Sequence, residues 1–307
     1  MRVPISAARR AAILAAVCCT AAVPALGQSP KEAWTAVDRA VGRPGTSQPG
    51  DVQKYSFPRS DLRVRAGGVE LKPALALGSW VALKRMSGSG GRAMAMGDLV
   101  LLETEVAPVI SKLQSMGVQQ TALHNHLQHE SPSVMYLHIQ AQGDPVKIGE
   151  AVRAAFALTK TPSAPPAAAA PGAAFGLDTV TLATALGHPG KVTGGVYQVS
   201  IPRAETIRMG DVDVPPSMGV ATALNFQPTG EGKAAITGDF VLTADEVNPV
   251  LRSLRDGGVE VTALHSHMLG EEPRLYFMHF WANDDAEKLG RTLHAALGHM
   301  KVKAAGA

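Results

Sequence analysis

One histidine pattern, His-x-His with a third histidine 12 residues further on, occurs twice in this chain. Its members are His124, His126 and His138 and, 141 positions later, His265, His267 and His279. Three neutral imidazoles are a sufficient ligand set for Zn²⁺ and leave one coordination position open for water or a substrate. The pattern therefore predicts a divalent metal site in each copy, with zinc as the first candidate. Copper, nickel and iron accept the same ligand type, so the pattern does not select among them.

Two hypotheses that involve no metal stay open for the same residues. Imidazoles can act as acid–base or anion-binding groups, or they can form hydrogen bonds inside a core. Identical spacing in both copies favours the metal reading over a lone core histidine, although shared ancestry makes the two copies dependent on each other.

The strands expected around the second copy would let its histidines meet. His265 and His267 are two residues apart on a predicted strand, so their side chains point to one face. If the following loop is centred near Glu271, His279 lies opposite Ala263 and diagonal to His265, and such neighbours are about 5 to 7 Å apart. A register slip of one residue would turn His279 to the other face. The first copy predicts the same geometry.

Four acidic residues accompany the histidines in both copies. Glu130 and Glu271 fall in the predicted hairpin loops, where either could add an oxygen ligand to the metal. Asp98 and Asp239 each follow a glycine at a predicted strand start. They could orient a ligating histidine from outside the ligand set, although their place at a strand start favours a turn or capping role.

Several other chemistries find no support in the sequence. Ser266 lies between two histidines, but its counterpart is Asn125, which argues against a catalytic triad. Residues 87–91 are glycine-rich without the lysine and helix of a phosphate-binding loop. Cys18 and Cys19 are the two cysteines, and both fall in an N-terminal segment that we expect to be removed. The remaining histidines lack a counterpart and are interpreted as surface or packing residues: His129, His188, His294 and His299.

An internal duplication organises the chain that carries these residues. Residues 97–126 and 238–267 align without a gap, and the likeness continues through both hairpins. Residues 159–176 are rich in proline and alanine, which predicts an extended linker. We therefore expect two tandem homologous domains, 34–158 and 177–300, that pack on each other.

The sequence of each repeat predicts an α+β domain. A helix opens it, extended segments follow, and then a strand leads into a helix, a hairpin and a last helix, as apolar spacing and capping residues indicate. Thr243 with Glu246 predicts a capping box for the second-repeat helix, unless Asn248 is the cap before Pro249. Glu105 and Glu246 are expected to favour the dipole at the helix start. The order strand–helix–strand–strand–helix suggests a ferredoxin-like or related α/β sandwich, with mixed or antiparallel sheets and helices packed on them.

The N-terminal end indicates export. Residues 1–27 combine basic residues, an apolar run of about 13 residues and a small-x-small exit, which describes a signal peptide. We expect a periplasmic or secreted protein without a lipid anchor, because a lipobox is weak here, and without a transmembrane segment after signal removal. The signal holds three of the 29 basic residues and no acid, so 26 remain against 26 acidic residues. This balance argues against nucleic-acid binding.

The histidine strings resemble a known family. VTALHSHMLGEEPRLYFMHFWA in the second repeat, and TALHNH with SPSVMYLHIQA in the first, look like the LppY/LpqO family of exported bacterial proteins, some of which are lipoproteins. The resemblance implies export and a duplicated domain of unknown function, and it supplies no reaction. The histidines shared with that family match the six named above. Gln140 stands where the second repeat has Trp281, so the first repeat is expected to be the weaker site.

Three functions remain open from the sequence. The protein could be a metal-dependent hydrolase, a non-catalytic module that binds a metal or another ligand, or an envelope-interaction protein with structural histidines. Its small-molecule or envelope ligand is unknown, and the sequence leaves open whether it is an enzyme.

Overall fold

The computed structural model describes residues 30–164 and 175–305. The predicted signal peptide, residues 1–27, and most of the predicted linker lie outside the described residues. Within the described ranges, no helix is both long enough and apolar enough to span a membrane.

The first repeat builds one six-stranded antiparallel sheet, ordered β1-β2-β5-β6-β8-β7, with helices packed on it. Its elements are α1 (Pro30–Val41), β1 (Thr46–Gln48), β2 (Val52–Pro58), β3 (Arg65–Ala66), β4 (Val69–Glu70), α2 (Pro73–Ala76), β5 (Gly78–Arg85), β6 (Ala93–Leu102), α3 (Glu103–Ser115), β7 (Gln119–His124), β8 (Val134–Gly143) and α4 (Pro145–Phe156).

The second repeat builds an equivalent antiparallel sheet, ordered β15-β17-β14-β13-β10-β9. Its elements are α5 (Thr179–Leu186), β9 (Lys191–Thr193), β10 (Val196–Pro202), β11 (Ile207–Met209), β12 (Val212–Val214), η1 (Pro216–Met218), β13 (Ala221–Gly230), β14 (Lys233–Leu242), α6 (Ala244–Asp256), β15 (Glu260–His265), β16 (Glu271–Glu272), β17 (Tyr276–Asp285) and α7 (Ala286–Leu297).

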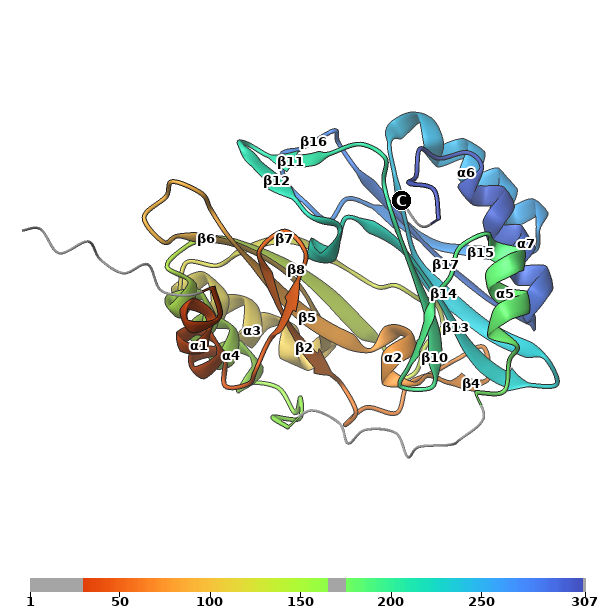
Figure 1. Cartoon of the computed structure of the whole chain (residues 1–307). Helices are drawn as coiled ribbons and strands as arrows, with labels where there is room; N and C mark the ends of the chain where they lie inside the picture. Colours follow the sequence, from red (N-terminus) through yellow and green to blue (C-terminus); the bar gives the residue numbers. More distant parts are fainter. Residues whose placement is uncertain (1–29, 165–174, 306–307) are drawn as a thin grey trace, which may run out of the picture.

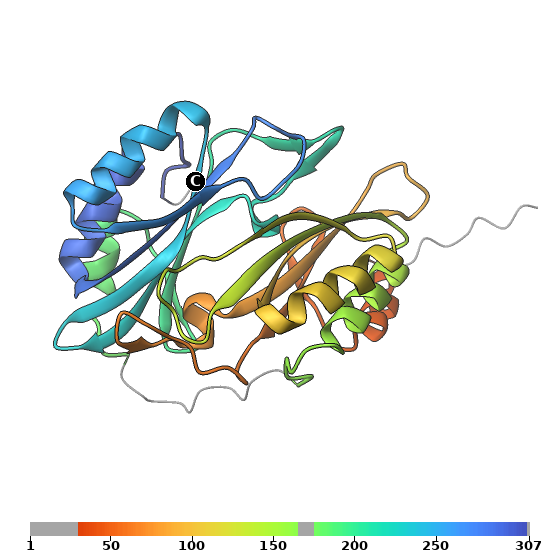
Figure 2. The same ribbon diagram turned by 180° about the vertical axis from the view of Figure 1, so that it is seen from behind.

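The predicted order strand–helix–strand–strand–helix is confirmed in both repeats, as β6-α3-β7-β8-α4 and β14-α6-β15-β17-α7. In the first sheet β8 lies between β6 and β7, and β5 flanks β6 on the other side. In the second sheet β17 lies between β14 and β15, and β13 flanks β14. Helices α1, α3 and α4 cover the outer face of the first sheet and α5, α6 and α7 that of the second, and the two sheets meet in the middle of the molecule (Figures 1 and 2).

The predicted hairpin strands end differently in the structure. The strand expected to hold both His265 and His267 ends at His265, and the next strand of the main sheet runs from Tyr276 to Asp285. The chain between them leaves the main sheet, because Glu271 and Glu272 pair with Met209 and Arg208 of β11 in a separate three-stranded sheet.

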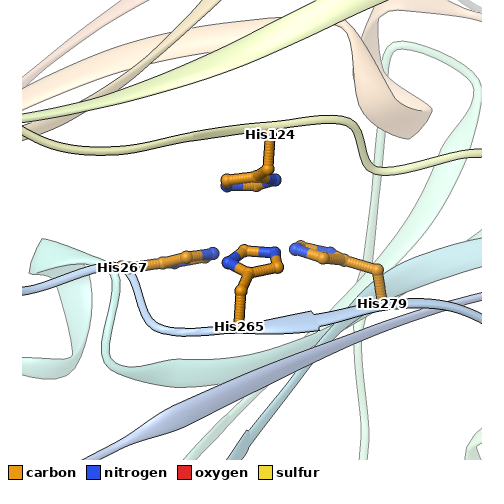
Figure 3. A group of neighbouring side chains, drawn as sticks. All are labelled: His124, His265, His267 and His279. Atoms are coloured by element: carbon orange, nitrogen blue, oxygen red, sulfur yellow. The ribbon is translucent and has the colours of Figure 1, made fainter.

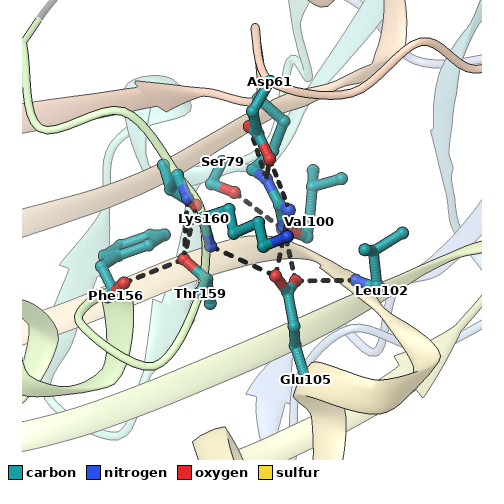
Figure 4. A network of polar contacts seen from close by, with 10 residues as sticks. Asp61, Ser79, Val100, Leu102, Glu105, Phe156, Thr159 and Lys160 are labelled. Carbon is teal, nitrogen blue, oxygen red and sulfur yellow. Dashed lines mark hydrogen bonds and ion pairs between the residues drawn. The ribbon is translucent and has the colours of Figure 1, made fainter.

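A buried ion pair joins strand to helix in each repeat. Arg59 Nη1 donates to Glu105 Oε2 over 2.7 Å, and Arg203 Nη1 donates to Glu246 Oε2 over 2.6 Å. Figure 4 shows the first network, in which Glu105 also accepts the Leu102 backbone N–H at 2.9 Å. Glu246 accepts the Thr243 N–H in the same way, so the predicted capping box is present. These carboxylates thus pair with a buried arginine, which their predicted role at the helix start did not include.

The two repeats share cores at their interface. One apolar cluster draws Met94 and Met96 from the first repeat and Met218, Met268 and Phe277 from the second. Another draws Val100 and Tyr136 from the first repeat and Val196 and Ala235 from the second, with Trp281 packed against it. The inner faces of the two sheets therefore bury each other, and they bring the hairpins of both repeats together.

Candidate metal centre

All six histidines of the repeated pattern lie in one cluster at this interface. His124 and His265 are the last residues of β7 and β15, and His138 and His279 lie within β8 and β17. His126 and His267 follow in the loops after β7 and β15. The sequence predicted one site in each repeat; the structure places the two triads side by side, and the first-repeat triad His124, His126 and His138 also forms a candidate ligand group of its own. The two triads meet because their strands border the face on which the repeats pack.

The hairpin register is the one predicted from the sequence. Ala263 is paired with His279, which places His279 diagonal to His265. The first repeat pairs Ala122 with His138 in the same way. A register irregularity between Val261 and Ala263 occurs before the histidines and leaves their relative positions as expected.

The cluster has an approximate two-fold symmetry that exchanges the repeats. Three ring pairs cross the interface: His124 with His265 at 3.6 Å between centroids, His126 with His279 at 3.9 Å, and His138 with His267 at 3.7 Å. The repeat offset of 141 residues relates the last two pairs to each other, because His126 corresponds to His267 and His138 corresponds to His279. The same offset relates His124 to His265. The axis therefore passes between His124 and His265.

Two threonines secure this arrangement from both sides. Thr121 Oγ1 donates to the His267 carbonyl, and Thr262 Oγ1 donates to the His126 carbonyl, each over 2.6 Å. These hydrogen bonds cross between repeats and hold the loops that carry His126 and His267. Sequence reasoning did not single out the threonines, although both belong to the TALH string that recurs in the two copies.

Four histidines form the largest candidate ligand group among the described residues. His124, from the first repeat, joins His265, His267 and His279, and their ring nitrogens all lie within 4.8 Å of one another. Figure 3 shows the four rings converging from β7 on one side and from β15, β17 and the loop after β15 on the other. Two smaller groups overlap with it: His124, His126 and His138, and His126, Asp239 and His279.

The ring nitrogens are arranged as in metal-ligating imidazoles. Within the described residues, the Nε2 atoms of all six histidines are buried and have no hydrogen-bond partner. The Nδ1 atoms of His124, His265 and His279 lie 3.2 to 3.4 Å from the backbone carbonyls of Asn125, Ser266 and Gly238, respectively. An Nδ1–H that donates to oxygen fixes the tautomer that leaves the Nε2 lone pair free for a cation.

The two aspartates lie beside the third histidine of each triad. Asp239 Oδ1 is 2.5 Å from His279 Nδ1, whereas Asp98 Oδ1 is 3.8 Å from His138 Nε2. Both sit inside long strands, β14 and β6, directly opposite these histidines in register. The favoured turn or capping role is therefore wrong, because the strands begin well before the aspartates. Asp239 lies against the Nδ1 of His279, where an orienting carboxylate would lie, whereas Asp98 is beyond hydrogen-bond distance of the Nε2 of His138.

The two glutamates serve the hairpin loops in the structure. Glu130 Oε1 accepts the Val134 N–H at 3.0 Å, and Glu271 Oε1 accepts the Leu275 N–H at 2.9 Å. Neither belongs to a candidate ligand group in the described part of the chain. The structure thus brings the six histidines and Asp239 together and leaves Glu130 and Glu271 as loop-stabilising acceptors.

Burial favours the neutral form of five of the imidazoles. It lowers the pKa of His124 to about 3 and that of His265 to about 4, and neighbouring imidazoles add to the effect. The pKa values of His126, His138 and His267 fall well below their ordinary range for the same two reasons. Neutral imidazole is the form that binds a metal ion.

The aspartates respond in opposite directions. Burial raises the pKa of Asp98 well above its ordinary value, and the charge of Asp239 raises it further. Burial would also raise the pKa of Asp239, but the adjacent His279 brings it below the ordinary value. Asp239 is therefore the anionic member of the pair and the stronger partner for an imidazole.

Aromatic rings close the cluster on two sides. Tyr136 stacks on His126 at 3.3 Å between centroids, and Phe277, its counterpart in the second repeat, stacks on His267 at 3.6 Å. These rings exclude water from one face of each imidazole, which strengthens electrostatic interactions inside the site.

Comparison with known proteins identifies a family and no activity. A family model described as "Domain of Unknown Function (DUF1259)" matches residues 35–158 and 180–299, one match for each repeat. No curated protein matches the chain. A solved structure described as a trimeric bacterial microcompartment shell protein, PduB, is 12% identical over 83% of this chain and 89% of its own, with a TM-score of 0.21. A likeness at this level supports no conclusion about fold or function.

Proposed function

This chain belongs to the DUF1259 family of unknown function, and we propose that it binds a transition-metal ion between its two repeats, with Zn²⁺ as the first divalent candidate. The ligands are His124, His265, His267 and His279. The observation that carries the proposal is the convergence of four ring nitrogens from both repeats within 4.8 Å.

The energetics of the cluster support a bound cation. A buried polar atom without a partner costs about 1–3 kcal/mol, and six Nε2 atoms are in that state among the described residues. A metal ion at the centre would satisfy several of them at once. The lowered pKa values add to this support, because His124, His265 and His267 need not lose protons before they bind a cation near neutral pH.

Elemental analysis of the protein purified from its native compartment tests the proposal. We expect near-stoichiometric metal in the parent protein and in His299→Ala, an exposed histidine outside the cluster. The double variant His265→Ala/His267→Ala should lose that metal while remaining folded. A parent protein that takes up no metal, even after addition of Zn²⁺, would contradict the proposal and favour structural histidines.

Metal-dependent hydrolysis is a second candidate function. It is favoured by the Asp239–His279 contact, since a carboxylate behind a ligating histidine raises the basicity of the ligand. A triad such as His124, His126 and His138 would leave a position for water on Zn²⁺. Screening ester and phosphoester substrates with and without chelator decides this point. Turnover that requires metal supports the hydrolase, and bound metal without turnover supports a non-catalytic binding module.

We also propose that the protein acts outside the cytoplasm, in the periplasm or secreted. Support comes from the composition of residues 1–27 and from the resemblance of the histidine strings to exported LppY/LpqO proteins. N-terminal sequencing of the protein from separated cell fractions tests this: a mature start near residue 28 is expected, and a cytoplasmic protein that retains residues 1–27 would contradict it.

A further inference from the structure

A small cavity of about 20 Å³ lies between the repeats, next to the histidine cluster. It has room for one atom of water size. Its walls come from both repeats and include His138, His267, Met96, Met218 and Met268.

The lining combines two chemical types of ligand. His138 and His267 are each 6% exposed, and their Nε2 atoms have no hydrogen-bond partner among the described residues. Met96, Met218 and Met268 are 6%, 0% and 1% exposed and come from β6, η1 and the loop after β15. Three methionine and two histidine side chains therefore line one small space.

The methionines occur on one side of the approximate two-fold axis. The positions that correspond to Met96 and Met268, offset by 141 residues, are Thr237 and Leu127. Gln140, which also lines the cavity, corresponds to Trp281. At the symmetry-related positions the interface packs with Thr237 and Leu127, which have no sulfur. Packing of the two repeats therefore does not require methionine at positions 96 and 268.

Thioether sulfur selects soft cations. Among biological metals, methionine with imidazole suits Cu(I), whereas Zn²⁺ rarely takes thioether ligands. The thiols of the chain are Cys18 and Cys19, both in the predicted signal peptide. If that peptide is removed, methionine and histidine are the softest ligands left in the protein.

From this lining we infer that the cavity is a binding position for monovalent copper, held by His138, His267 and the methionine sulfurs. The inference rests on the proposed metal-binding function and narrows its metal: His267 belongs to both positions, so the protein takes either a divalent ion in the histidine cluster or Cu(I) at the adjacent thioether position. Binding involves no redox step, because the ion enters and leaves as Cu(I).

Competitive titration of the metal-free full chain tests the inference. Cu(I) is titrated anaerobically against a Cu(I)-specific chelator, and Zn²⁺ is titrated separately. The variant Met96→Leu/Met218→Leu/Met268→Leu keeps side-chain volume and removes the sulfurs. We expect its Cu(I) affinity to fall by more than about 10-fold while its Zn²⁺ affinity stays within about 2-fold of the parent. Met94→Leu is the matched control, because Met94 is buried in the same strand but does not line the cavity.

X-ray absorption on the Cu(I)-loaded parent protein gives a readout that requires no variant. Copper–sulfur scattering is expected, and a copper shell of nitrogen alone would overturn the inference even if the triple variant fails to fold. Equal Cu(I) affinity in the parent and a folded triple variant would overturn it as well. Failure of the parent to bind Zn²⁺ and Cu(I) would instead reject the proposed function itself, so the two failures are distinguishable.

Discussion

His124 and His265, which occupy the same position in the two repeats, lie against each other across the repeat interface with ring centroids 3.6 Å apart and ring planes tilted by 37°. Neither repeat can place four imidazoles around one ion from its own residues, since each has three in the cluster. The candidate metal centre is therefore a property of the repeat pair.

The first prediction follows from that shared site. His124→Ala should lower Zn²⁺ affinity by more than about 100-fold, although the other three ligands of the group lie in the second repeat. We expect this because replacing a residue that only supports a ligand already costs about 10–100-fold. Isothermal titration calorimetry measures the change, with His299→Ala as control. Parent-like affinity in His124→Ala would show that the second repeat binds the metal alone.

The second prediction compares the two aspartates. Asp239→Asn should reduce metal affinity by about 10–100-fold, because it removes the negative charge that lies 2.5 Å from the Nδ1 of His279. Asp98→Asn should have a smaller effect, since Asp98 Oδ1 is 3.8 Å from the Nε2 of His138 and burial raises its pKa. The same titration on both variants checks the ranking, and an equal or reversed ranking would contradict the role given to Asp239.

The third prediction concerns acid. A histidine whose pKa is lower in the folded state binds fewer protons there than in the unfolded chain, where its pKa is about 6.5. The metal-free protein should therefore be fully stabilised above pH 6.5 and lose stability as the pH falls from 6.5 towards 4. Each histidine that stays neutral contributes up to about 1.4 kcal/mol per pH unit.

Two acids oppose this trend without reversing it. Burial raises the pKa of Glu130 to about 7 and that of Asp98 well above its ordinary value, so both favour the folded state at lower pH. Five histidines with lowered pKa values outweigh these two acids. Urea unfolding of the metal-free protein at pH 7.5, 6 and 5 measures how the free energy of unfolding changes with pH. Constant stability over that interval would show that the imidazoles are not buried as neutral groups.

The fourth prediction concerns the buried ion pairs behind the site. Arg59→Ala should destabilise the fold by about 3–5 kcal/mol, because it leaves the buried Glu105 carboxylate unpaired. Arg59→Met/Glu105→Leu should cost less than the single change, since it removes both charges together. Chemical denaturation measures the free energy of unfolding of both variants. Arg208→Ala, which breaks the exposed ion pair with Asp213, serves as the comparison. A double variant less stable than the single one would contradict this account.

Much of the local structure could be predicted from the sequence. Apolar periodicity and capping residues gave the strand–helix–strand–strand–helix order, and the pairing of Ala263 with His279 was expected from the hairpin loop. The buried pairing of Arg59 with Glu105 was missed, because these residues are 46 positions apart and no local pattern links them.

The sequence by itself determined the duplication and the six histidines, because both are written in residue order and spacing. Tertiary structure alone decided that the two triads form one cluster, that Asp239 rather than Glu271 lies against His279, and that three methionines line a space beside it. The physical reason is that strand periodicity fixes which face a side chain occupies, whereas the partner of that face depends on how the two sheets bury their apolar surfaces against each other.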